Sequence, residues 1–252
     1  MCRLIYKQGA GEPMPSAGNL TRQEVLEGVG LSEDFVRHEL AQCSLVKPRV
    51  GGSYRIVVFR GSHDLRDWLT NFTVEPVVCS TGGKAHEGFL NALNSVWEKL
   101  SELLGEDDSS IFFTGHSLGG ALATLAAAMY EKRCQLYTFG SPLVGDEEFS
   151  AALRNAASYR IVNNRDIVTT VPPAVPPCES FRHIPKLHYI THEGKILDEP
   201  SPEAVAKDRM KRDHVNFLGV DWEIHFNFRG APEPLADHAP VNYVAHLDRA
   251  LQ

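Results

Sequence analysis

The stretch Ile111-Phe112-Phe113-Thr114-Gly115-His116-Ser117-Leu118-Gly119-Gly120-Ala121-Leu122 decides the fold of this chain. Three consecutive apolar residues predict a buried strand, and the residues from Leu118 onward predict a helix. Between them, Gly115-x-Ser117-x-Gly119 is the pattern of a serine on a sharp strand-to-helix turn. Such a turn strains the serine backbone, and side chains two residues away on either side would collide with it. The stretch therefore predicts Ser117 as a nucleophile whose hydroxyl projects above a sheet.

Strand-like and helix-like segments alternate on both sides of this stretch. The run Tyr54–Phe59 is β-branched and nearly all apolar, as in a strand buried on both faces. Further strands are expected at 134–139, 158–162 and 186–191, and helices at 21–28, 32–40, 65–72, 86–105, 118–129, 146–155, 200–217 and 243–251. This alternation predicts an α/β fold with a mostly parallel central sheet covered by helices on both faces. We expect one domain over residues 1–252, in which the Gly-, Pro- and Ser-rich segment 1–18 lies over the surface or is mobile.

Two short helices are expected before the first buried strand. Thr21-x-x-Glu24 has the form of a capping box, and glycines at 28 and 30 would close the helix that it opens. Ser32 is expected to cap a second helix with one apolar face, formed by Leu31, Phe35, Val36 and Leu40.

Composition narrows the class of protein. A formal net charge of −7 without a basic stripe argues against nucleic-acid binding. The sequence has no run of about eighteen apolar residues that would predict a membrane span, and its first residues lack the apolar core of a secretory signal. Five cysteines without metal-ligand spacing indicate free thiols in a reducing compartment. A cytoplasmic protein is therefore expected, although a secreted protein with a trimmed signal would look the same.

A serine nucleophile needs a histidine base and an acid that orients the histidine. In this strand-turn-helix setting the acid follows the serine and the histidine comes later. Asp146 and Asp166 compete for the acid. Asp146 stands where a helix is expected to begin, and an N-cap role explains it. Asp166 lies in a loop just past a strand, where such an acid belongs, so Asp166 is the prediction.

Seven histidines follow Asp166, namely His183, His188, His192, His214, His225, His238 and His246. His238 follows Asp237 in a loop just before the last helix, a place from which an imidazole can reach the serine. Position alone favours His238 and leaves His225 as the second candidate.

A short amphipathic helix follows Arg60-Gly61-Ser62 at the end of a buried strand. Its apolar face has helical spacing and consists of Leu65, Trp68, Leu69 and Phe72. Such a face ordinarily packs on the core of its own domain. Because this one adjoins the candidate site, it is interpreted as a lid.

Several motifs together resemble those of one family. They are Val57-Val58-Phe59-Arg60-Gly61-Ser62, Trp68, His86-Glu87-Gly88-Phe89, Thr114-Gly115-His116-Ser117-Leu118-Gly119-Gly120-Ala121, Phe139-Gly140-Ser141-Pro142-Leu143-Val144-Gly145, Asn163-Asn164-Arg165-Asp166-Ile167-Val168, His192-x-Gly194 and Asp237-His238. In this order, over roughly residues 50–250, they resemble the class 3 lipases, the fungal-type triacylglycerol lipases of the α/β-hydrolase fold.

The resemblance implies Ser117, Asp166 and His238 as a catalytic triad, and the backbone N–H groups of Ser62 and Leu118 as an oxyanion hole. It also implies that the 65–72 helix is the lid, with Trp68 at the family's lid tryptophan. Three features depart from the fungal pattern. The tyrosine after His238 comes only at Tyr243, the segment from Asp166 to His238 is long and carries the extra charged helix at 200–217, and the cysteines do not suggest disulfides.

The predicted function is a serine carboxylic-ester hydrolase that acts on acylglycerols or similar lipid esters, at an oil–water or membrane interface, without metal or organic cofactor. A first rival is an esterase for soluble short-chain or feruloyl-type esters on the same scaffold. A second is a catalytically silent, lipase-like module that binds partners, against which the complete set of Ser, Asp and His argues.

Overall fold

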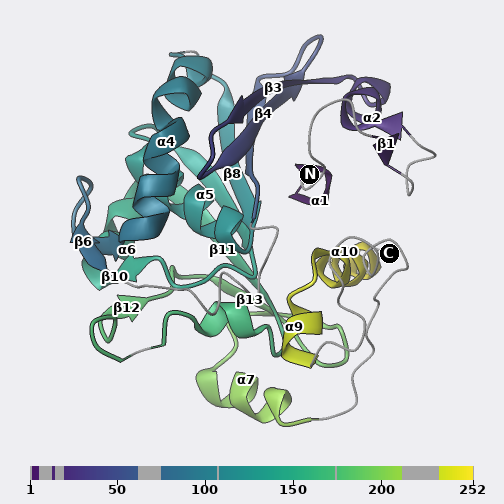
Figure 1. Cartoon of the computed structure of the whole chain (residues 1–252). Helices are drawn as coiled ribbons and strands as arrows, with labels where there is room; N and C mark the ends of the chain where they lie inside the picture. The colour runs from purple at the N-terminus through teal and green to yellow at the C-terminus, as the bar shows by residue number, and fades with distance from the viewer. Residues whose placement is uncertain are drawn as a thin grey trace.

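The computed structural model describes residues 2–5, 13–14, 20–61, 75–106, 108–173, 175–211 and 233–251. A mixed sheet of eight strands forms its centre (Figure 1). In spatial order the strands are β14 (Ile196–Asp198), β13 (Leu187–Ile190), β11 (Ala156–Asn163), β9 (Cys134–Phe139), β8 (Ser110–His116), β5 (Tyr54–Phe59), β4 (Gln42–Pro48) and β3 (Leu31–Arg37). The middle strands from β13 to β5 run parallel, whereas β14, β4 and β3 pair antiparallel. The predicted mostly parallel sheet is therefore confirmed.

The centre of the sheet consists of the apolar runs that the sequence marked. Phe113 of β8 pairs with Val57 of β5 on one side and with Leu136 of β9 on the other. All three side chains are fully buried. Because parallel strands align their carboxyl ends, the loops that follow β5, β8, β9 and β11 gather at one edge of the sheet. That edge is where Ser117 and Asp166 stand.

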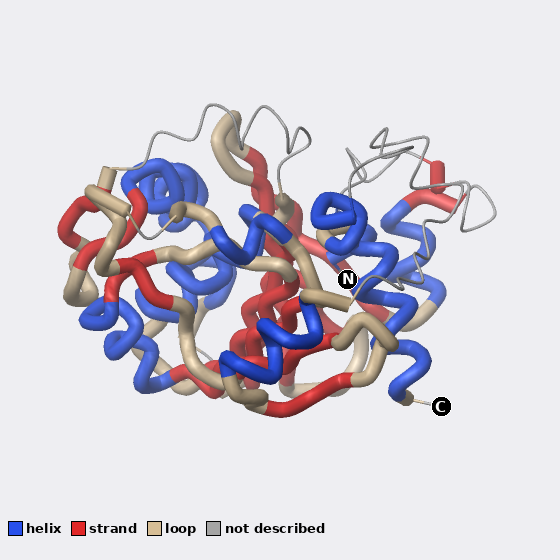
Figure 2. The backbone as a smooth tube through the Cα atoms, turned by 90° about the horizontal axis from the view of Figure 1, so that it is seen from below, coloured by secondary structure: helices blue, strands red, loops and turns tan. Residues whose placement is uncertain are grey.

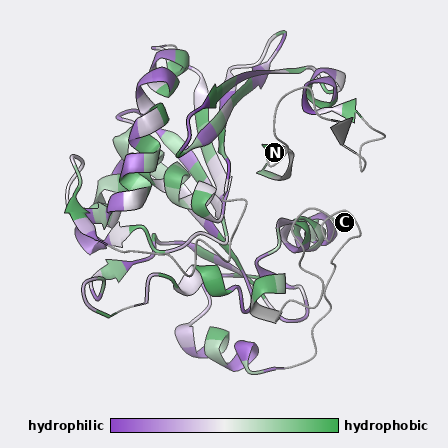
Figure 3. Cartoon of the chain, viewed as in Figure 1, coloured by the Kyte–Doolittle hydropathy of each residue, from purple (hydrophilic) through white to green (hydrophobic). Residues whose placement is uncertain are grey.

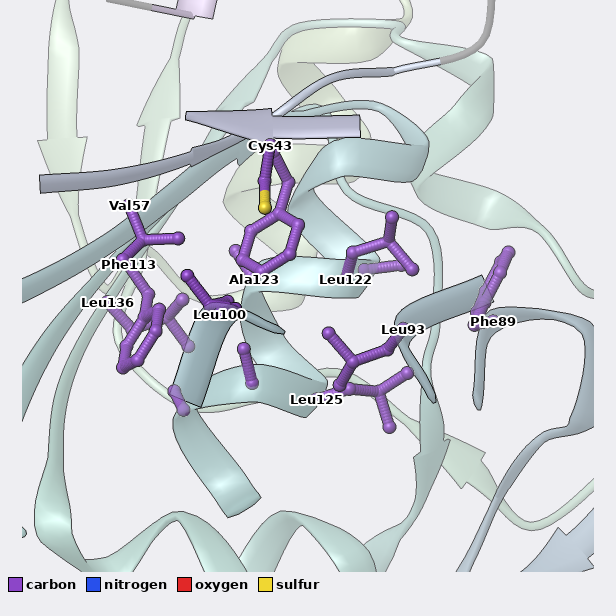
Figure 4. Close-up of a cluster of buried hydrophobic side chains, with 14 of the residues drawn as sticks. Cys43, Val57, Phe89, Leu93, Leu100, Phe113, Leu122, Ala123, Leu125 and Leu136 are labelled. Atoms are coloured by element: carbon purple, nitrogen blue, oxygen red, sulfur yellow. The ribbon is translucent and has the colours of Figure 1, made fainter. Parts of the chain in front are cut away.

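Helices cover both faces of the sheet, as Figure 2 shows from below. On one face, α5 (Leu118–Met129) packs against β8, β9 and β5, and α4 (Glu87–Leu104) packs against α5, β3 and β4. Their apolar side chains form the core drawn in Figure 4. On the other face lie α1 (Cys2–Ile5) and α10 (Pro240–Ala250). The remaining helices are α2 (Arg22–Gly28), α6 (Glu147–Ala151), α7 (Pro202–Arg209) and α9 (Glu233–Asp237), with the 3₁₀ turns η2 (Ala152–Asn155) and η3 (Ile167–Thr170).

Two smaller sheets flank this core. One contains, in spatial order, β12 (Phe181–Arg182), β10 (Gly145–Asp146), β7 (Lys84–His86) and β6 (Pro76–Val78), and the other pairs β1 (Pro13–Met14) with β2 (Leu20–Thr21).

None of the helices in the described part of the chain combines the length and the apolar character of a membrane span.

The helix predicted at 32–40 is wrong, because residues 31–37 form strand β3. Every residue of β3 pairs with a residue of β4, a strand that the sequence did not reveal. Within β3, Glu33 accepts a hydrogen bond from the buried Arg22 of α2 at 3.0 Å. Apolar residues at 31, 35 and 36 fit one helix face as well as they fit a strand, so pairing with β4 decided the outcome. Residues 233–237, for which neither a helix nor a strand was predicted, form α9.

The remaining predicted helix ends largely agree with the structure. Thr21 and Glu24 form the expected capping box of α2, and Gly105 terminates α4. Ser201 caps α7, which ends at Arg209, while residues 212–217 of the predicted 200–217 helix lie outside the described residues.

The start of α4 couples folding to pH. His86 is only 3% exposed and accepts a hydrogen bond from the N–H of Phe89 through Nδ1. Burial lowers the pKa of His86 to about 4, from an ordinary 6.5. Between these pH values the unfolded chain binds a proton that the folded chain does not, so the free energy of unfolding falls as the pH drops.

We expect this one histidine to make the protein about 2 kcal/mol less stable at pH 5 than at pH 7.5. Urea unfolding of the wild type and of His86→Asn at both pH values measures the effect. Asparagine also caps helices but does not titrate, so the variant should lose about that much of the pH dependence. An unchanged pH dependence in His86→Asn would contradict the assignment.

Candidate active site

Ser117 stands on the predicted sharp turn. It is the residue between the end of β8 at His116 and the start of α5 at Leu118, and its backbone has φ 60° and ψ −130°. A Cβ at Gly115 would lie 2.1 Å from the carbonyl oxygen of Gly119, and a Cβ at Gly119 would lie 2.3 Å from the carbonyl oxygen of Phe59 in β5, so each close approach requires glycine. A non-glycine residue in such a conformation persists only where its surroundings enforce it. Here β8 and the buried α5 enforce it.

Asp166 and His238 are in direct contact. Nδ1 of His238 lies 2.9 Å from each carboxylate oxygen of Asp166, and both residues are buried. Asp166 follows β11 and caps η3, where its Oδ1 also accepts the N–H of Val168 at 2.9 Å. A carboxylate only accepts hydrogen bonds, so the proton of His238 is on Nδ1. The other ring nitrogen, Nε2, is then the basic one.

Tyr243 completes the surroundings of the acid. Its hydroxyl donates to Oδ2 of Asp166 at 2.6 Å and accepts the backbone N–H of Asn163 at 3.0 Å. Burial and the adjacent carboxylate raise the pKa of Tyr243 well above its ordinary value, so the phenol keeps its proton. In the sequence, Tyr243 stands out only as a tyrosine that follows His238 later than in the fungal pattern. Its bond to Asp166 leaves no local signal, because the pairing spans 77 residues.

His116 contacts both the backbone and the ring of His238. Its Nε2–H donates to the carbonyl oxygen of His238 at 2.7 Å, and the two rings lie 4.4 Å apart between centroids. Burial and the neighbouring His238 keep the pKa of His116 well below 6.5, so its ring is neutral. Because His116 directly precedes Ser117, this contact fixes the His238 loop beside the strained turn.

The end of β9 brings the three predicted residues together. The N–H of Ser117 donates to the carbonyl oxygen of Phe139 at 3.0 Å. The next residue, Gly140, has φ 56°, and a Cβ there would lie 2.4 Å from Oδ2 of Asp166 and 3.0 Å from Nδ1 of His238. Ser117 and the Asp166–His238 pair thus flank the same two residues of the chain.

The competing acid and histidines have other roles. Asp146 caps α6 through the N–H of Phe149 at 2.9 Å, as its position predicted. Among the other histidines, His183 bonds to the carbonyl oxygen of Thr169, His188 bonds to Asp198 and His192 bonds to Asp208. His246 lies against Gly194. His214 and the second candidate His225 lie outside the described residues.

Of the predicted oxyanion hole, the structure describes Leu118. As the first residue of α5, it has an N–H that no carbonyl of its own helix can accept, and this N–H stands at the positive end of the helix dipole. A cavity of about 230 Å³ adjoins Leu118 and extends along Gly61 to Leu40 in the β3–β4 turn.

Other predicted site residues lie outside the described residues, namely Ser62 and the lid residues Leu65, Trp68, Leu69 and Phe72. Within the described ranges, no three His, Cys, Asp or Glu side chains are grouped so that they could hold a metal ion.

Comparisons with known proteins agree on one family. Residues 56–175 match the family described as lipase (class 3). The secreted mono- and diacylglycerol lipase 1 of Fusarium solani is 36% identical over 156 residues, which cover 57% of this chain and 45% of that protein. The lipase of Rhizomucor miehei is 35% identical over 191 residues, which cover 66% of this chain and 52% of that lipase. The chain thus spans about half the length of these curated relatives. A solved triacylglycerol lipase, described as having a serine protease triad, matches with a TM-score of 0.61 and 26% identity over 76% of this chain and 82% of that one.

Proposed function

Because the chain has the α/β-hydrolase fold and matches the class 3 lipases over residues 56–175, we propose that it is a serine carboxylic-ester hydrolase that cleaves lipid esters such as acylglycerols. The observation that carries the proposal is the buried Asp166–His238 pair beside the strained Ser117. The names of the Fusarium and Rhizomucor relatives support lipid esters as the substrate class.

The proposed reaction uses Ser117 as the nucleophile, His238 as the base and Asp166 as the acid that orients His238. Nε2 of His238 removes the hydroxyl proton of Ser117 as its oxygen attacks the ester carbonyl. Asp166 holds the imidazole through Nδ1 and stabilises the imidazolium that forms. The imidazolium then gives its proton to the departing alcohol oxygen, which leaves an acyl-enzyme. Water, activated by the same nitrogen, attacks the acyl carbon, and the fatty acid is released with the hydroxyl of Ser117 restored.

The negative oxygen of each tetrahedral intermediate needs hydrogen-bond donors. We assign this role to the backbone N–H of Leu118, at the start of α5, and to that of Ser62. Preorganised donors of this kind are worth about 10²–10³ in rate each, because they need no rearrangement as the charge develops.

The lid belongs to the same proposal. The apolar residues Leu65, Trp68, Leu69 and Phe72 would cover the serine in water and turn outward into lipid at an interface. A reducing compartment is part of the proposal as well. It is supported by the five free thiols, whereas the Fusarium relative carries "secreted" in its name.

Initial rates on tributyrin, measured from below to above its solubility limit, test the proposal. We expect hydrolysis with a steep rise in rate when emulsion droplets form, since the lid then opens. Smooth saturation below the limit would identify the rival esterase of soluble esters. No hydrolysis of tributyrin or of short-chain and feruloyl esters would leave the non-catalytic module.

A further inference from the structure

Helix α7 is attached to the protein by polar contacts. Asp208 is the one buried residue of Pro202–Arg209, and the helix mixes hydrophilic and hydrophobic residues along its length (Figure 3). A helix of eight residues without an apolar face is not stable by itself, because tertiary packing normally supplies most of its stability. Its contacts through Asp208 and Arg209 therefore decide where it lies.

The carboxylate of Asp208 receives four hydrogen bonds. Oδ2 accepts from Nδ2 of Asn164 at 2.8 Å, from the backbone N–H of His192 at 2.8 Å and from the hydroxyl of Tyr189 at 3.1 Å. Oδ1 accepts from Nδ1 of His192 at 2.6 Å, and the ammonium of Lys211 lies 3.4 Å away. Burial alone would raise the pKa of Asp208, but these hydrogen bonds outweigh it and lower the pKa, so the group is a carboxylate.

These contacts converge on the turn that carries the triad acid. Asn164 is fully buried with φ 27°, a left-handed conformation that its surroundings must enforce. The side chain of Asn164 donates to the carboxylate of Asp208, and the carbonyl oxygen of Asn164 accepts from Nε of Arg209 at 2.8 Å. The next residue, Arg165, donates from Nε to the carbonyl oxygen of Arg209 at 2.6 Å. Helix α7 is thus hydrogen-bonded to Asn164 and Arg165, the two residues directly before Asp166.

We propose that Asp208 is a positioning residue, through which α7 holds the Asn163–Asp166 turn so that the carboxylate of Asp166 faces Nδ1 of His238. The proposal rests on the proposed function of the triad. It gives a role to the charged helix that the fungal sequence pattern does not explain. The side chain of Asp208 touches no reacting atom, and it acts through Asn164 on Asp166.

The variant Asp208→Asn tests the proposal. Asparagine at position 208 has one acceptor oxygen in place of two, and its NH₂ group would face a hydrogen-bond donor. The variant therefore loses part of the hydrogen bonding that holds Asn164 in its turn. With a soluble short-chain ester, kcat per active site should fall about tenfold while KM stays within about twofold. Active sites are counted by covalent titration of Ser117 with a phosphonate, which removes misfolded protein from the comparison. Glu203→Gln makes the same chemical change at an exposed position of α7 and should leave kcat unchanged.

Two further variants keep the test decisive. Tyr189→Phe removes the hydrogen bond to Asp208 and the one that the same hydroxyl accepts from Nδ2 of Asn164 at 3.1 Å, without changing the shape of the core. It should lower kcat about threefold in the same way if Asp208→Asn does not fold. In an Asp166→Asn background, Asp208→Asn should have less than about a twofold further effect, because its influence passes through Asp166.

An unchanged kcat per titrated site, a change confined to KM, or a full additional loss in the Asp166→Asn background would each overturn the proposal. Failure of the proposed function looks different. The wild type would then hydrolyse no ester, or Asp166→Asn would itself retain full activity.

Discussion

Replacing Ser117 with alanine is expected to reduce ester hydrolysis by about 10⁵–10⁶-fold, to the level of the blank. The proposed acyl-enzyme forms on this one hydroxyl, and neither His238 nor Asp166 can replace it. The expected loss of stability is small. The Ser117 side chain makes no capping hydrogen bond to α5, and alanine adopts the same backbone with no greater steric demand.

The measurement compares initial rates on tributyrin and on a soluble ester with thermal unfolding of the same preparations. Ser101→Ala is the matched control, because Ser101 is an exposed serine on α4 and its loss should leave the activity unchanged. Wild-type rates in Ser117→Ala would contradict the assignment of the nucleophile and require another residue to carry the reaction. A large drop in melting temperature would mean that the variant reports on folding instead.

Replacing Gly115 with alanine is expected to destabilise the protein by about 3 kcal/mol or more and to abolish activity. The new Cβ would lie 2.1 Å from backbone carbon and oxygen atoms of Gly119, so no side-chain rotation relieves the collision. Helix α5 would have to move away from β8. Most of α5 is buried in the core of Figure 4, and the movement would also displace Ser117 and Leu118.

Gly28→Ala is the control for this prediction. Nothing lies within 4 Å of a Cβ at Gly28, the last residue of α2, so alanine there should be neutral or stabilise by up to about 1 kcal/mol. Urea unfolding at neutral pH gives both free energies. A stable and fully active Gly115→Ala would show that the turn does not need the close approach of β8 and α5.

The sequence by itself determined the parts of this protein that depend on neighbouring residues. The apolar run before Gly115 and the helix after Ser117 follow from periodicity, and both are present as β8 and α5. The capping box of Thr21 and Glu24 marked a helix start, because the side chains that satisfy the first N–H groups lie within three residues of them. The resemblance to the class 3 lipases, drawn from short motifs in order, is confirmed by the comparisons. Chain order and position favoured Asp166 and His238 and left His225 as a second candidate, and the resemblance implied His238. The structure brings Asp166 and His238 into contact.

Only the tertiary structure decided the features that depend on distant partners. Residues 31–37 are a strand because β4 offers hydrogen bonds along their whole length, which outweighs a helix-like pattern. Tyr243 bonds to Asp166 across 77 residues, and Asp208 bonds to Asn164 across 44. No local pattern distinguishes these polar side chains from others on the same helices. Their roles arise because the fold buries them opposite one another, where an unsatisfied polar group is costly and each one therefore requires its partner.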